Sequence, residues 1–322
     1  MSNSLKTKST VKVDNSKSSL LGVADTAIIG GGVVGCAVAR RLSLAGISVV
    51  LLEKASDILD GASKGNSAIL HTGFDAPEGS LELACIRSGY REYLEIRESL
   101  NLPLLKTGAL VAAWTPEEEE RFPEILEKAH NNGIDDLRQL SRQEILVMEP
   151  DISGNILAAI AVPSEFVIDP WSAPLAYLSQ AVANGGQAFF NAEVKGGEFF
   201  GNHWMLQTKR GTIKATHVIN CAGLFGDLVD VEVLGQSDFT IKPRKGQFVV
   251  FDKAAGCLVR SIVLPVPSER TKGIVIFPTI FGNLAVGPTA EEQDSRNDAS
   301  VNQVILQALH TQAVSKIPAL AN

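Results

Sequence analysis

Residues 26–54 constrain the fold of this chain more than any other segment. A short apolar run at 27–29 is followed by the sequence GGGVVG at 30–35 and a helix-like segment, and a second apolar run at 47–52 ends at Glu53. This order of strand, glycine-rich turn, helix, strand and acid is typical of a dinucleotide-binding βαβ unit, in which the acid accepts hydrogen bonds from ribose hydroxyls. The segment therefore predicts nucleotide binding, and the alternative is a glycine-rich turn that serves packing alone.

The residue types in the turn have mechanical reasons. Gly30 permits a tight turn, Gly32 lets a pyrophosphate approach the main chain, and Gly35 lets the helix pack close to the strand. The first helical N–H groups, at Val33 and Val34, would face the phosphates together with the positive end of the helix dipole.

Size and composition exclude several other classes of protein. A chain of 322 residues, 45% hydrophobic and 20% charged, is long enough for two domains or one large α/β domain. Its net charge of −7 argues against nucleic acid as a partner. No apolar stretch is long enough to predict a transmembrane segment. Residues 1–23, rich in Ser and Lys, are expected to form a disordered leader, with a mitochondrial targeting segment as the alternative.

The spacing of cysteines and histidines predicts no metal site. The four cysteines form no CxxC pair, and the five histidines are scattered. The cysteines are therefore expected to be thiols in a reducing compartment. We expect a cytoplasmic protein, with the mitochondrion as the alternative.

Local signals place several helices and strands. The sequences TPEE at 115–118 and SRQE at 141–144 are capping boxes, and they predict helices that run to about residues 131 and 149. Strand-like segments lie at 109–113, 187–190, 218–219, 247–251, 274–277 and 283–286. Together they predict an α/β fold (α+β overall), with a Rossmann-like domain interleaved with a second domain that has a mixed or antiparallel sheet.

Three later segments add to the dinucleotide motif: GASKGNSAILHTG at 61–73, NAEV at 191–194 and VINCAG at 218–223. With the turn at 30–35, they resemble the FAD-dependent oxidoreductases of the D-amino-acid-oxidase superfamily, on the branch that holds L-2-hydroxyglutarate oxidases and anaerobic glycerol-3-phosphate dehydrogenases. The resemblance runs from about residue 24 to the end of the chain. An NAD dehydrogenase would share the first motif but has no reason to show the later segments, so FAD is the expected cofactor.

The resemblance also implies which residues contact FAD. In the family, the segment at 61–73 passes along the pyrophosphate and beneath the isoalloxazine ring, and Ala68 stands where Gly is usual. The valine of the NAEV segment meets the adenine through its main chain, and the segment at 218–223 closes over the nucleotide from the other side. The residues expected to bind FAD are Gly30, Gly32, Val33, Val34, Gly35, Glu53, Lys54, Ser63, Asn66, Ser67, Val194, Ala222 and Gly223.

The resemblance implies a division of the chain as well. Residues 24–85 and 150–230 would form the FAD-binding domain, and residues 86–149 and 231–322 the substrate domain. The family normally continues with a further strand, a glycine-rich turn and a helix that contact the flavin, so we expect this chain to be truncated at its C-terminal end.

The implied activity is oxidation of the CH–OH group of a small anionic substrate, a 2-hydroxy acid such as L-2-hydroxyglutarate or glycerol 3-phosphate, by hydride transfer to flavin N5. His71 is the candidate base or, alternatively, a structural histidine. One of Arg244, Lys245, Arg260 and Lys272 would meet the substrate's carboxylate or phosphate, unless these cations lie on solvated strand edges. The electron acceptor is open between oxygen, a quinone and a protein. The alternative functions are an FAD-dependent amine or amino-acid oxidase and a catalytically inactive nucleotide-binding fragment.

Overall fold

The computed structural model describes residues 19–267 and 273–321. Contacts between residues divide the chain into two compact units: unit 1 holds the residues up to 60 with 177–240, and unit 2 holds 61–176 with 241–322. Most of the leader expected at 1–23 lies outside the described residues. Its last part, from Leu20, belongs to the first strand, which therefore starts before the expected domain start at residue 24.

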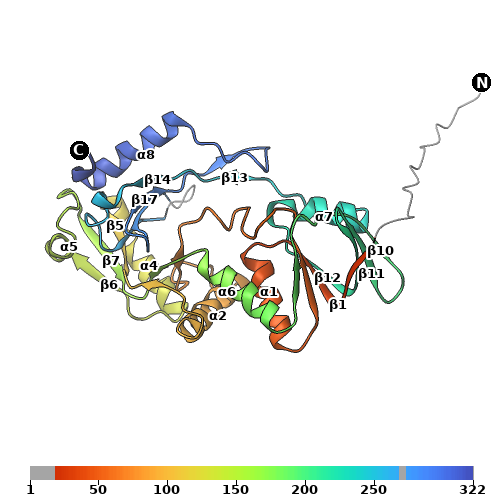
Figure 1. Ribbon diagram of the computed structural model, residues 1–322. Helices are drawn as coiled ribbons and strands as arrows, with labels where there is room; N and C mark the ends of the chain where they lie inside the picture. Colours follow the sequence, from red (N-terminus) through yellow and green to blue (C-terminus); the bar gives the residue numbers. More distant parts are fainter. Residues whose placement is uncertain (1–18, 268–272, 322) are drawn as a thin grey trace, which may run out of the picture. The chain divides into compact units, whose positions relative to one another are not determined.

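Unit 1 is built on a six-stranded sheet in the order β10-β11-β12-β1-β2-β9. Figure 1 labels four of these strands, β1, β10, β11 and β12. Its strands are β1 (Leu20–Ile29), β2 (Val49–Leu52), β9 (Gln187–Phe189), β10 (Val194–Phe199), β11 (Trp204–Thr208) and β12 (Gly211–Asn220). β12, β1, β2 and β9 run parallel, whereas β10 and β11 extend the sheet antiparallel from β12. The parallel strands confirm the Rossmann-like unit predicted from residues 26–54.

Both faces of the parallel strands are buried. The side chains of Ile28 and Leu51 pack with α1 (Val33–Leu44) and with the end of α6 (Ser172–Ala183). Those of Ile29 and Leu52 belong to a second cluster, which includes a residue of α7 (Gly226–Leu234). Strands buried on both faces need apolar residues at successive positions, which explains the uninterrupted apolar runs before and after the glycine turn.

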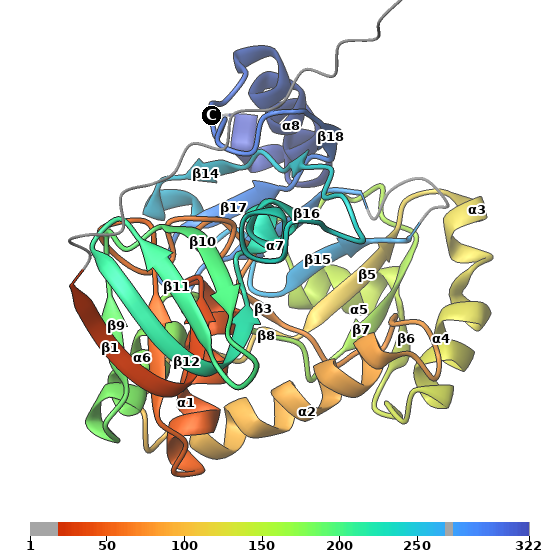
Figure 2. The same ribbon diagram turned by 90° about the vertical axis from the view of Figure 1, so that its right-hand side faces the viewer.

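Unit 2 contains a seven-stranded sheet in the order β14-β17-β16-β15-β5-β7-β6, which can be followed in Figure 2. Its strands are β5 (Ala109–Ala113), β6 (Arg138–Ser141), β7 (Ala158–Val162), β14 (Val249–Phe251), β15 (Ile262–Pro265), β16 (Val275–Pro278) and β17 (Leu284–Gly287). Only β15 and β5 pair parallel among the described strands of this sheet; the other pairs are antiparallel. The mixed sheet predicted for the second domain is thereby confirmed.

Helices cover both faces of the seven-stranded sheet. The helices of unit 2, besides the first half of α6, are α2 (Leu81–Ile96), α3 (Pro116–Glu119), α4 (Phe122–Asn131), α5 (Arg142–Met148) and α8 (Gln303–Lys316), with short 3₁₀ turns at Lys253–Ala255 and Pro318–Ala321. Phe122 and Ile125 of α4 pack on one face. Ile145 of α5 and Ala313 of α8 pack on the other.

Two small sheets complete unit 2. In the first, β3 (Ile69–Leu70) and β4 (Leu104–Leu105) both pair antiparallel with β8 (Phe166–Ile168). In the second, β13 (Arg244–Lys245) pairs antiparallel with β18 (Glu291–Glu292).

Both predicted capping boxes form, at Thr115 with Glu118 and at Ser141 with Glu144. The helix predicted from 116 to 131 is nevertheless two helices, α3 and α4. Pro123 gives the reason, because it has no N–H to donate to the preceding turn of a continuous helix.

Unit 2 takes in more of the chain than the expected substrate domain. Residues 61–85 and 150–176 cluster with unit 2, and residues 231–240 cluster with unit 1. The reason is strand pairing: β3 pairs with β8, and β7 lies between β5 and β6, so both segments belong to sheets of unit 2. The assignment of FAD and substrate to separate stretches of chain stays a prediction.

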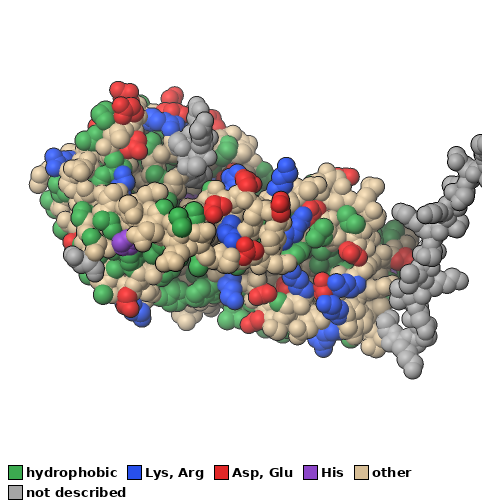
Figure 3. Space-filling model, turned by 90° about the horizontal axis from the view of Figure 1, so that it is seen from above, with side chains coloured by type: hydrophobic (Ala, Val, Ile, Leu, Met, Phe, Trp, Pro, Cys, Tyr) green, Lys and Arg blue, Asp and Glu red, His purple; other side chains and the backbone are tan. Residues whose placement is uncertain are grey.

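On the face shown in Figure 3, Lys and Arg side chains lie among Asp and Glu side chains. None of the described helices has the length and apolarity that crossing a membrane requires. Within residues 19–267 and 273–321, no group of three or more His, Cys, Asp or Glu side chains is placed to hold a metal ion.

Candidate functional site

The turn between β1 and α1 has room for glycine alone at two positions. Gly30 has a φ of +111°, and a Cβ built on it would lie 2.4 Å from the carbonyl oxygen of Cys221. A Cβ on Gly35 would lie 1.9 Å from the carbonyl oxygen of Gly30. Both distances are shorter than real Cβ contacts. These glycines therefore let β1, α1 and the end of β12 approach through their main chains.

The start of α1 suits an anion. Gly32 is the N-cap residue, with φ −75° and ψ −179°, and as a glycine it has no side chain of its own to cap the helix. The first turn holds no acidic residue, and Val33 and Val34 are exposed. The main-chain N–H groups and the positive end of the helix dipole favour negative charge at this point.

Glu53 holds the glycine turn from the neighbouring strand. Its buried carboxylate accepts hydrogen bonds from the main-chain N–H groups of Gly31, at 2.6 Å, and Ala55, at 2.8 Å. A carboxylate offers about four lone-pair positions, so these bonds leave acceptor capacity for ribose hydroxyls. The ribose contact stays a prediction, and the bond to Gly31 is a second role that the sequence did not indicate.

The predicted residues of unit 1 gather at one edge of the parallel sheet. Residues 30–35 follow β1, Glu53 follows β2, and Ala222 and Gly223 follow β12. β1 pairs in parallel with both of its neighbours, so the carboxyl ends of the three strands lie side by side. Ligands of open α/β sheets bind at the carboxyl ends of the strands.

Lys54 and Val194 lie next to this edge. The ammonium nitrogen of Lys54 is 3.2 Å from the centroid of the Phe225 ring, and burial lowers the pKa of Lys54. Val194 begins β10, and the chain leading to it is tied to β2 because the N–H of Ala192 donates to the carbonyl oxygen of Glu53 at 2.8 Å. The structure thus brings together the unit 1 residues that the sequence assigned to FAD.

The remaining residues assigned to FAD, Ser63, Asn66 and Ser67, form a turn before β3 in unit 2. Asn66 shapes this turn: its Nδ2 donates to the carbonyl oxygen of Ser63 at 2.9 Å, and its Oδ1 accepts from the N–H of Ala68 at 2.8 Å. Ala68 has a φ of +55°, a region that favours glycine. This backbone conformation gives a reason for the glycine that is usual here in the proteins that the sequence resembles.

His71 lies at the end of β3, where a buried carboxylate meets it. β3 and β8 are antiparallel, and their register places His71 opposite Glu165. The Nδ1 atom of His71 lies 3.0 Å from Oε2 of Glu165, whose side chain is 0% exposed. Oε1 of Glu165 accepts hydrogen bonds from the main-chain N–H and the hydroxyl of Thr72, at 2.7 and 2.8 Å.

Asn132 fixes the same loop from the end of α4. Its buried Nδ2 donates to the carbonyl oxygens of Gly73, Phe74 and Ala76, at 2.9, 3.3 and 2.9 Å. Sequence reasoning missed both Asn132 and Glu165. The sequence indicates Asn132 only as part of a helix end, and it gives no local signal for Glu165, which stands in a polar turn before a short strand.

Comparison with known proteins shows which family this architecture represents. The model of the DAO family, described as FAD dependent oxidoreductase, matches residues 25–322. The chain belongs to this family. The resemblance drawn from the motifs is therefore confirmed, and FAD is the cofactor of the family.

Relatives of this FAD-dependent family member include a glycerol 3-phosphate dehydrogenase of Caloramator mitchellensis, 36% identical, covering 83% of this chain and 56% of that protein. An L-2-hydroxyglutarate dehydrogenase of Indibacter alkaliphilus is 29% identical, covering 86% of this chain and 70% of that protein. Among solved structures, the dithionite-reduced L-alpha-glycerophosphate oxidase of Mycoplasma pneumoniae with FAD bound has a TM-score of 0.84 at 27% identity, covering 92% of this chain and 79% of that one. The chain thus spans little more than half the length of the first of these relatives.

The geometry of unit 1 fits the dinucleotide of the FAD-dependent family. Two positions of the turn exclude any side chain, and the first turn of the helix holds no acidic residue. Glu53 keeps acceptor capacity beside them. The contact of each residue with FAD stays a prediction.

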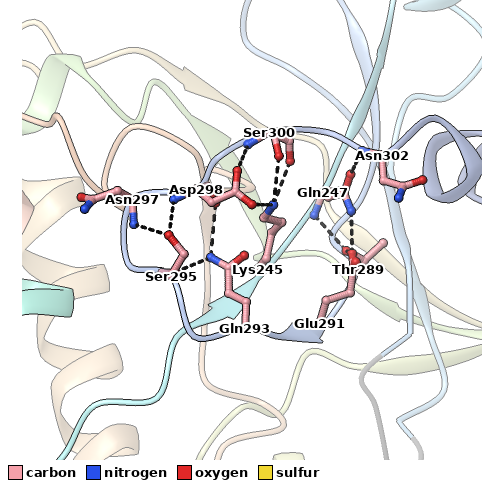
Figure 4. Close-up of polar contacts among 10 residues, drawn as sticks. All are labelled: Lys245, Gln247, Thr289, Glu291, Gln293, Ser295, Asn297, Asp298, Ser300 and Asn302. Atoms are coloured by element: carbon pink, nitrogen blue, oxygen red, sulfur yellow. Dashed lines mark hydrogen bonds and ion pairs between the residues drawn. The ribbon is translucent and has the colours of Figure 1, made fainter.

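Two of the cations expected to meet the substrate, Arg244 and Lys245, already have acidic partners in unit 2. Arg244 forms an exposed ion pair with Glu292, to which its Nε donates at 2.8 Å. The side chain of Lys245 is 15% exposed, and its ammonium group donates to Oδ2 of Asp298 at 2.9 Å and to the carbonyl oxygen of Ser300 at 3.0 Å (Figure 4). The bond from Lys245 holds the pKa of Asp298 below its usual value.

Lys245 is part of a wider polar network, which Figure 4 shows. Gln247 donates to Glu291 at 2.8 Å and accepts from the N–H of Asn302, the N-cap of α8, at 2.6 Å. The network ties β13 and β18 to the start of α8. Lys272 lies outside the described residues, and the roles of all these cations in binding a substrate stay predictions.

Proposed function

We propose that this chain is an FAD-dependent oxidoreductase that oxidises the CH–OH group of a small anionic substrate, either glycerol 3-phosphate or a 2-hydroxy acid such as L-2-hydroxyglutarate. The observation that carries the proposal is the 36% identity, over 83% of this chain, to a glycerol 3-phosphate dehydrogenase. The relative named L-2-hydroxyglutarate dehydrogenase supports the wider substrate class. Both names describe oxidation of an alcohol on a small anion.

In this proposal, the main-chain amides of residues 30–35 bind the diphosphate of FAD, and Glu53 binds a ribose. The remaining contacts come from Lys54, Ser63, Asn66, Ser67, Val194, Ala222 and Gly223. FAD, when bound, supplies the acceptor for a hydride at N5. The protein's own task is to hold the substrate with its C–H bond in reach and its charge compensated.

His71 takes the proton of the substrate hydroxyl. An imidazole suits this task because it gains and loses a proton near neutral pH. The side chain of His71 is 44% exposed, so solvent can remove the proton once it has been taken.

A cation binds the carboxylate or phosphate of the substrate. Arg244 and Lys245 already contact carboxylates, so the substrate anion would have to displace Glu292 or Asp298 to reach them. Substituting Met for each of Arg244, Lys245, Arg260 and Lys272 in turn identifies the cation. The variant that lacks the substrate-binding cation should have a KM for the anionic substrate at least about tenfold higher, with its flavin still bound. The reason is that a charge-assisted hydrogen bond contributes about 1.5–3 kcal/mol.

Anaerobic mixing of the purified flavoprotein with candidate substrates tests the proposal. Glycerol 3-phosphate or L-2-hydroxyglutarate should bleach the visible absorbance of the flavin. Bleaching by amino acids instead would favour an amine or amino-acid oxidase. A flavin that only dithionite bleaches would favour a catalytically inactive nucleotide-binding protein. Turnover of the reduced protein with oxygen, a quinone analogue or a protein acceptor then identifies the electron acceptor.

We also propose a reducing compartment, the cytoplasm, with the mitochondrion as the alternative. Support comes from the four cysteines, which are all free thiols. Burial raises the pKa of Cys36, beside the glycine turn, to about 12, so this thiol stays protonated and unreactive. Fractionation of cells with an antibody to the chain tests the location.

A further inference from the structure

Glu165 is a fully buried carboxylate to which the reaction proposed above gives no chemical role. A buried charge is costly unless its oxygens are compensated. Thr72 compensates Oε1 with two hydrogen bonds. Apart from the contact with Nδ1 of His71 at 3.0 Å, Oε2 has no hydrogen-bond partner within the described part of the chain. The histidine is therefore the group that balances the second oxygen.

The surroundings keep this carboxylate in place. Tyr90 of α2 stacks its ring on Phe166, with ring centroids 6.1 Å apart, and its hydroxyl donates to the carbonyl oxygen of Ser164 at 2.8 Å. The hydroxyl of Ser164 donates to Asp136 at 2.6 Å. Burial and, less strongly, the charges of Glu165 and Asp136 raise the pKa of Tyr90, so this phenol stays neutral. The residues on both sides of Glu165 are thus anchored.

We propose that Glu165 is a positioning residue that fixes the tautomer of His71. This inference rests on the proposed function, in which His71 is the base. A carboxylate opposite Nδ1 requires a proton on that nitrogen, so the neutral ring carries its lone pair on Nε2. The O–H bond of the substrate then breaks as an N–H bond forms at Nε2, and FAD, when bound, would accept the hydride from the carbon that carries this hydroxyl. The carboxylate stabilises the imidazolium that results.

The substitution Glu165→Gln isolates this role. The N–H of Thr72 is a donor, so the amide oxygen must take the position of Oε1 and the amide NH₂ group must face His71. A donor in that position requires Nδ1 to be the acceptor, and the proton moves to Nε2. The side chain keeps its size, while the base loses its lone pair at the working nitrogen.

Two measurements test the effect of Glu165→Gln on His71. Nitrogen-15 NMR of the five histidines, with the His71 signals assigned by their loss in His71→Gln, should show the Nδ1–H tautomer in the unaltered chain and the Nε2–H tautomer in Glu165→Gln. Steady-state kinetics should show kcat lowered about 100-fold with KM changed less than threefold, the scale of general base catalysis. The acid limb of the kcat profile should move to lower pH, because the amide no longer stabilises the imidazolium.

Glu149→Gln is the matched control. Glu149 is also a buried carboxylate of unit 2, and it accepts hydrogen bonds from the main-chain N–H groups of Arg260 and Ser261, at 3.0 and 2.7 Å. Its loss should lower stability but leave the tautomer of His71 and the acid limb unchanged. Equal effects of both variants on the acid limb would mean that Glu165 acts on stability alone, and would overturn the proposal.

The NMR arm needs neither FAD nor turnover, so it separates this inference from the proposed function. An Nε2–H tautomer of His71 in the unaltered chain overturns the positioning role, even if Glu165→Gln does not fold. An Nδ1–H tautomer that survives in Glu165→Gln overturns it as well. Absence of turnover on any alcohol with the expected tautomers in both proteins would instead refute the proposed reaction and leave the hold of Glu165 on His71 established.

Discussion

The turn at residues 30–35 and the loop at residues 71–76 both follow a strand, but different groups hold them. In the turn, main chain packs on main chain, and a Cβ on Gly35 would collide with the carbonyl oxygen of Gly30. In the loop, the side chains of Glu165 and Asn132 reach in from distant parts of the chain and bond to Thr72 and to three carbonyl oxygens. The turn needs the absence of side chains, whereas the loop needs their presence.

This difference separates two kinds of sensitivity. A main-chain turn is damaged by added atoms, because its contacts have no room for them. A loop held by buried side chains is damaged by removed atoms, because each lost donor leaves an uncompensated acceptor. The same distinction applies to the proposed function, in which the turn presents main-chain N–H groups to a ligand and the loop fixes one reactive side chain.

The largest expected effect comes from Gly32→Asp, which tests whether the turn binds a diphosphate. Asp is a favoured N-cap residue and Gly32 has an ordinary φ, so the fold should be kept. Its carboxylate would repel the pyrophosphate by about 4 kcal/mol at about 4 Å, which weakens FAD about 1,000-fold. Fluorescence titration of the apoprotein with FAD measures this change. Gly32→Asn, which introduces an N-cap side chain of equal size without charge, should lose less affinity for FAD. Equal losses of affinity in the Asp and Asn variants would mean that the size of the side chain, and not its charge, weakens binding.

Gly35→Ala tests the main-chain contact itself. Alanine favours a helix over glycine, yet the added Cβ would lie 1.9 Å from the carbonyl oxygen of Gly30. We expect the free energy of unfolding to fall by about 3 kcal/mol, measured by urea denaturation. Gly89→Ala, in α2 with no atom within 4 Å of the added Cβ, should instead be neutral or gain up to about 1 kcal/mol. If the two variants behaved alike, the close approach of the turn would be refuted.

Asn132→Ala tests the side-chain hold on the loop. Its buried amide donates to Gly73, Phe74 and Ala76, and removal leaves their carbonyl oxygens without that donor. The free energy of unfolding should fall by about 2 kcal/mol, and the amide of Ala76 should exchange its hydrogen faster. The neighbouring Asn131→Ala, which removes only an exposed 3.4 Å contact with Glu78, should cost less than about 0.5 kcal/mol. If Asn131→Ala and Asn132→Ala lowered the free energy of unfolding by similar amounts, the hydrogen bonds of Asn132 would not be what fixes the loop.

The contrast between the two regions also explains how much could be predicted from the sequence. The turn is local: its glycines, the following helix and Glu53 lie within one βαβ unit, so the spacing alone indicates the geometry. The capping boxes at 115–118 and 141–144 were predicted for the same reason. By contrast, 93 residues separate Thr72 from Glu165 and 59 separate Gly73 from Asn132. The register of two short antiparallel strands brings the first pair together, and no local pattern encodes that register.

The ion pairs of Arg244 and Lys245 could not be predicted from the sequence for the same reason. Arg244 and Lys245 stand out in the sequence as candidate anion ligands, but their acidic partners Glu292 and Asp298 follow about fifty residues later, with several strands between. The break between α3 and α4 is a different case, because Pro123 was visible and its effect on a continuous helix is general. Here the sequence holds the signal, because Pro123 interrupts the single helix that the capping box at 115–118 predicts.

Ala68→Gly has the smallest expected effect, and it tests an exception to the comparison. Ala68 stands just before the His71 loop with a φ of +55°, so a side chain occupies a backbone conformation of the kind that the β1–α1 turn reserves for glycine. A left-handed alanine costs about 1–2 kcal/mol, and glycine would remove this cost but lose about 0.4–1 kcal/mol through its more flexible unfolded state. We therefore expect a gain of about 0.5 kcal/mol in the free energy of unfolding, measured from the urea midpoint.

Ala84→Gly, at an exposed position in the first half of α2, is the control and should have the opposite effect, a loss of about 1 kcal/mol in the free energy of unfolding. A loss of stability in both variants would show that the left-handed backbone conformation at residue 68 carries no cost for alanine. The hydrogen bonds of Asn66 and Ile168 to the main chain of Ala68 would then stabilise this conformation. This turn, like the loop at residues 71–76, would be held by specific contacts and not by the flexibility of a glycine.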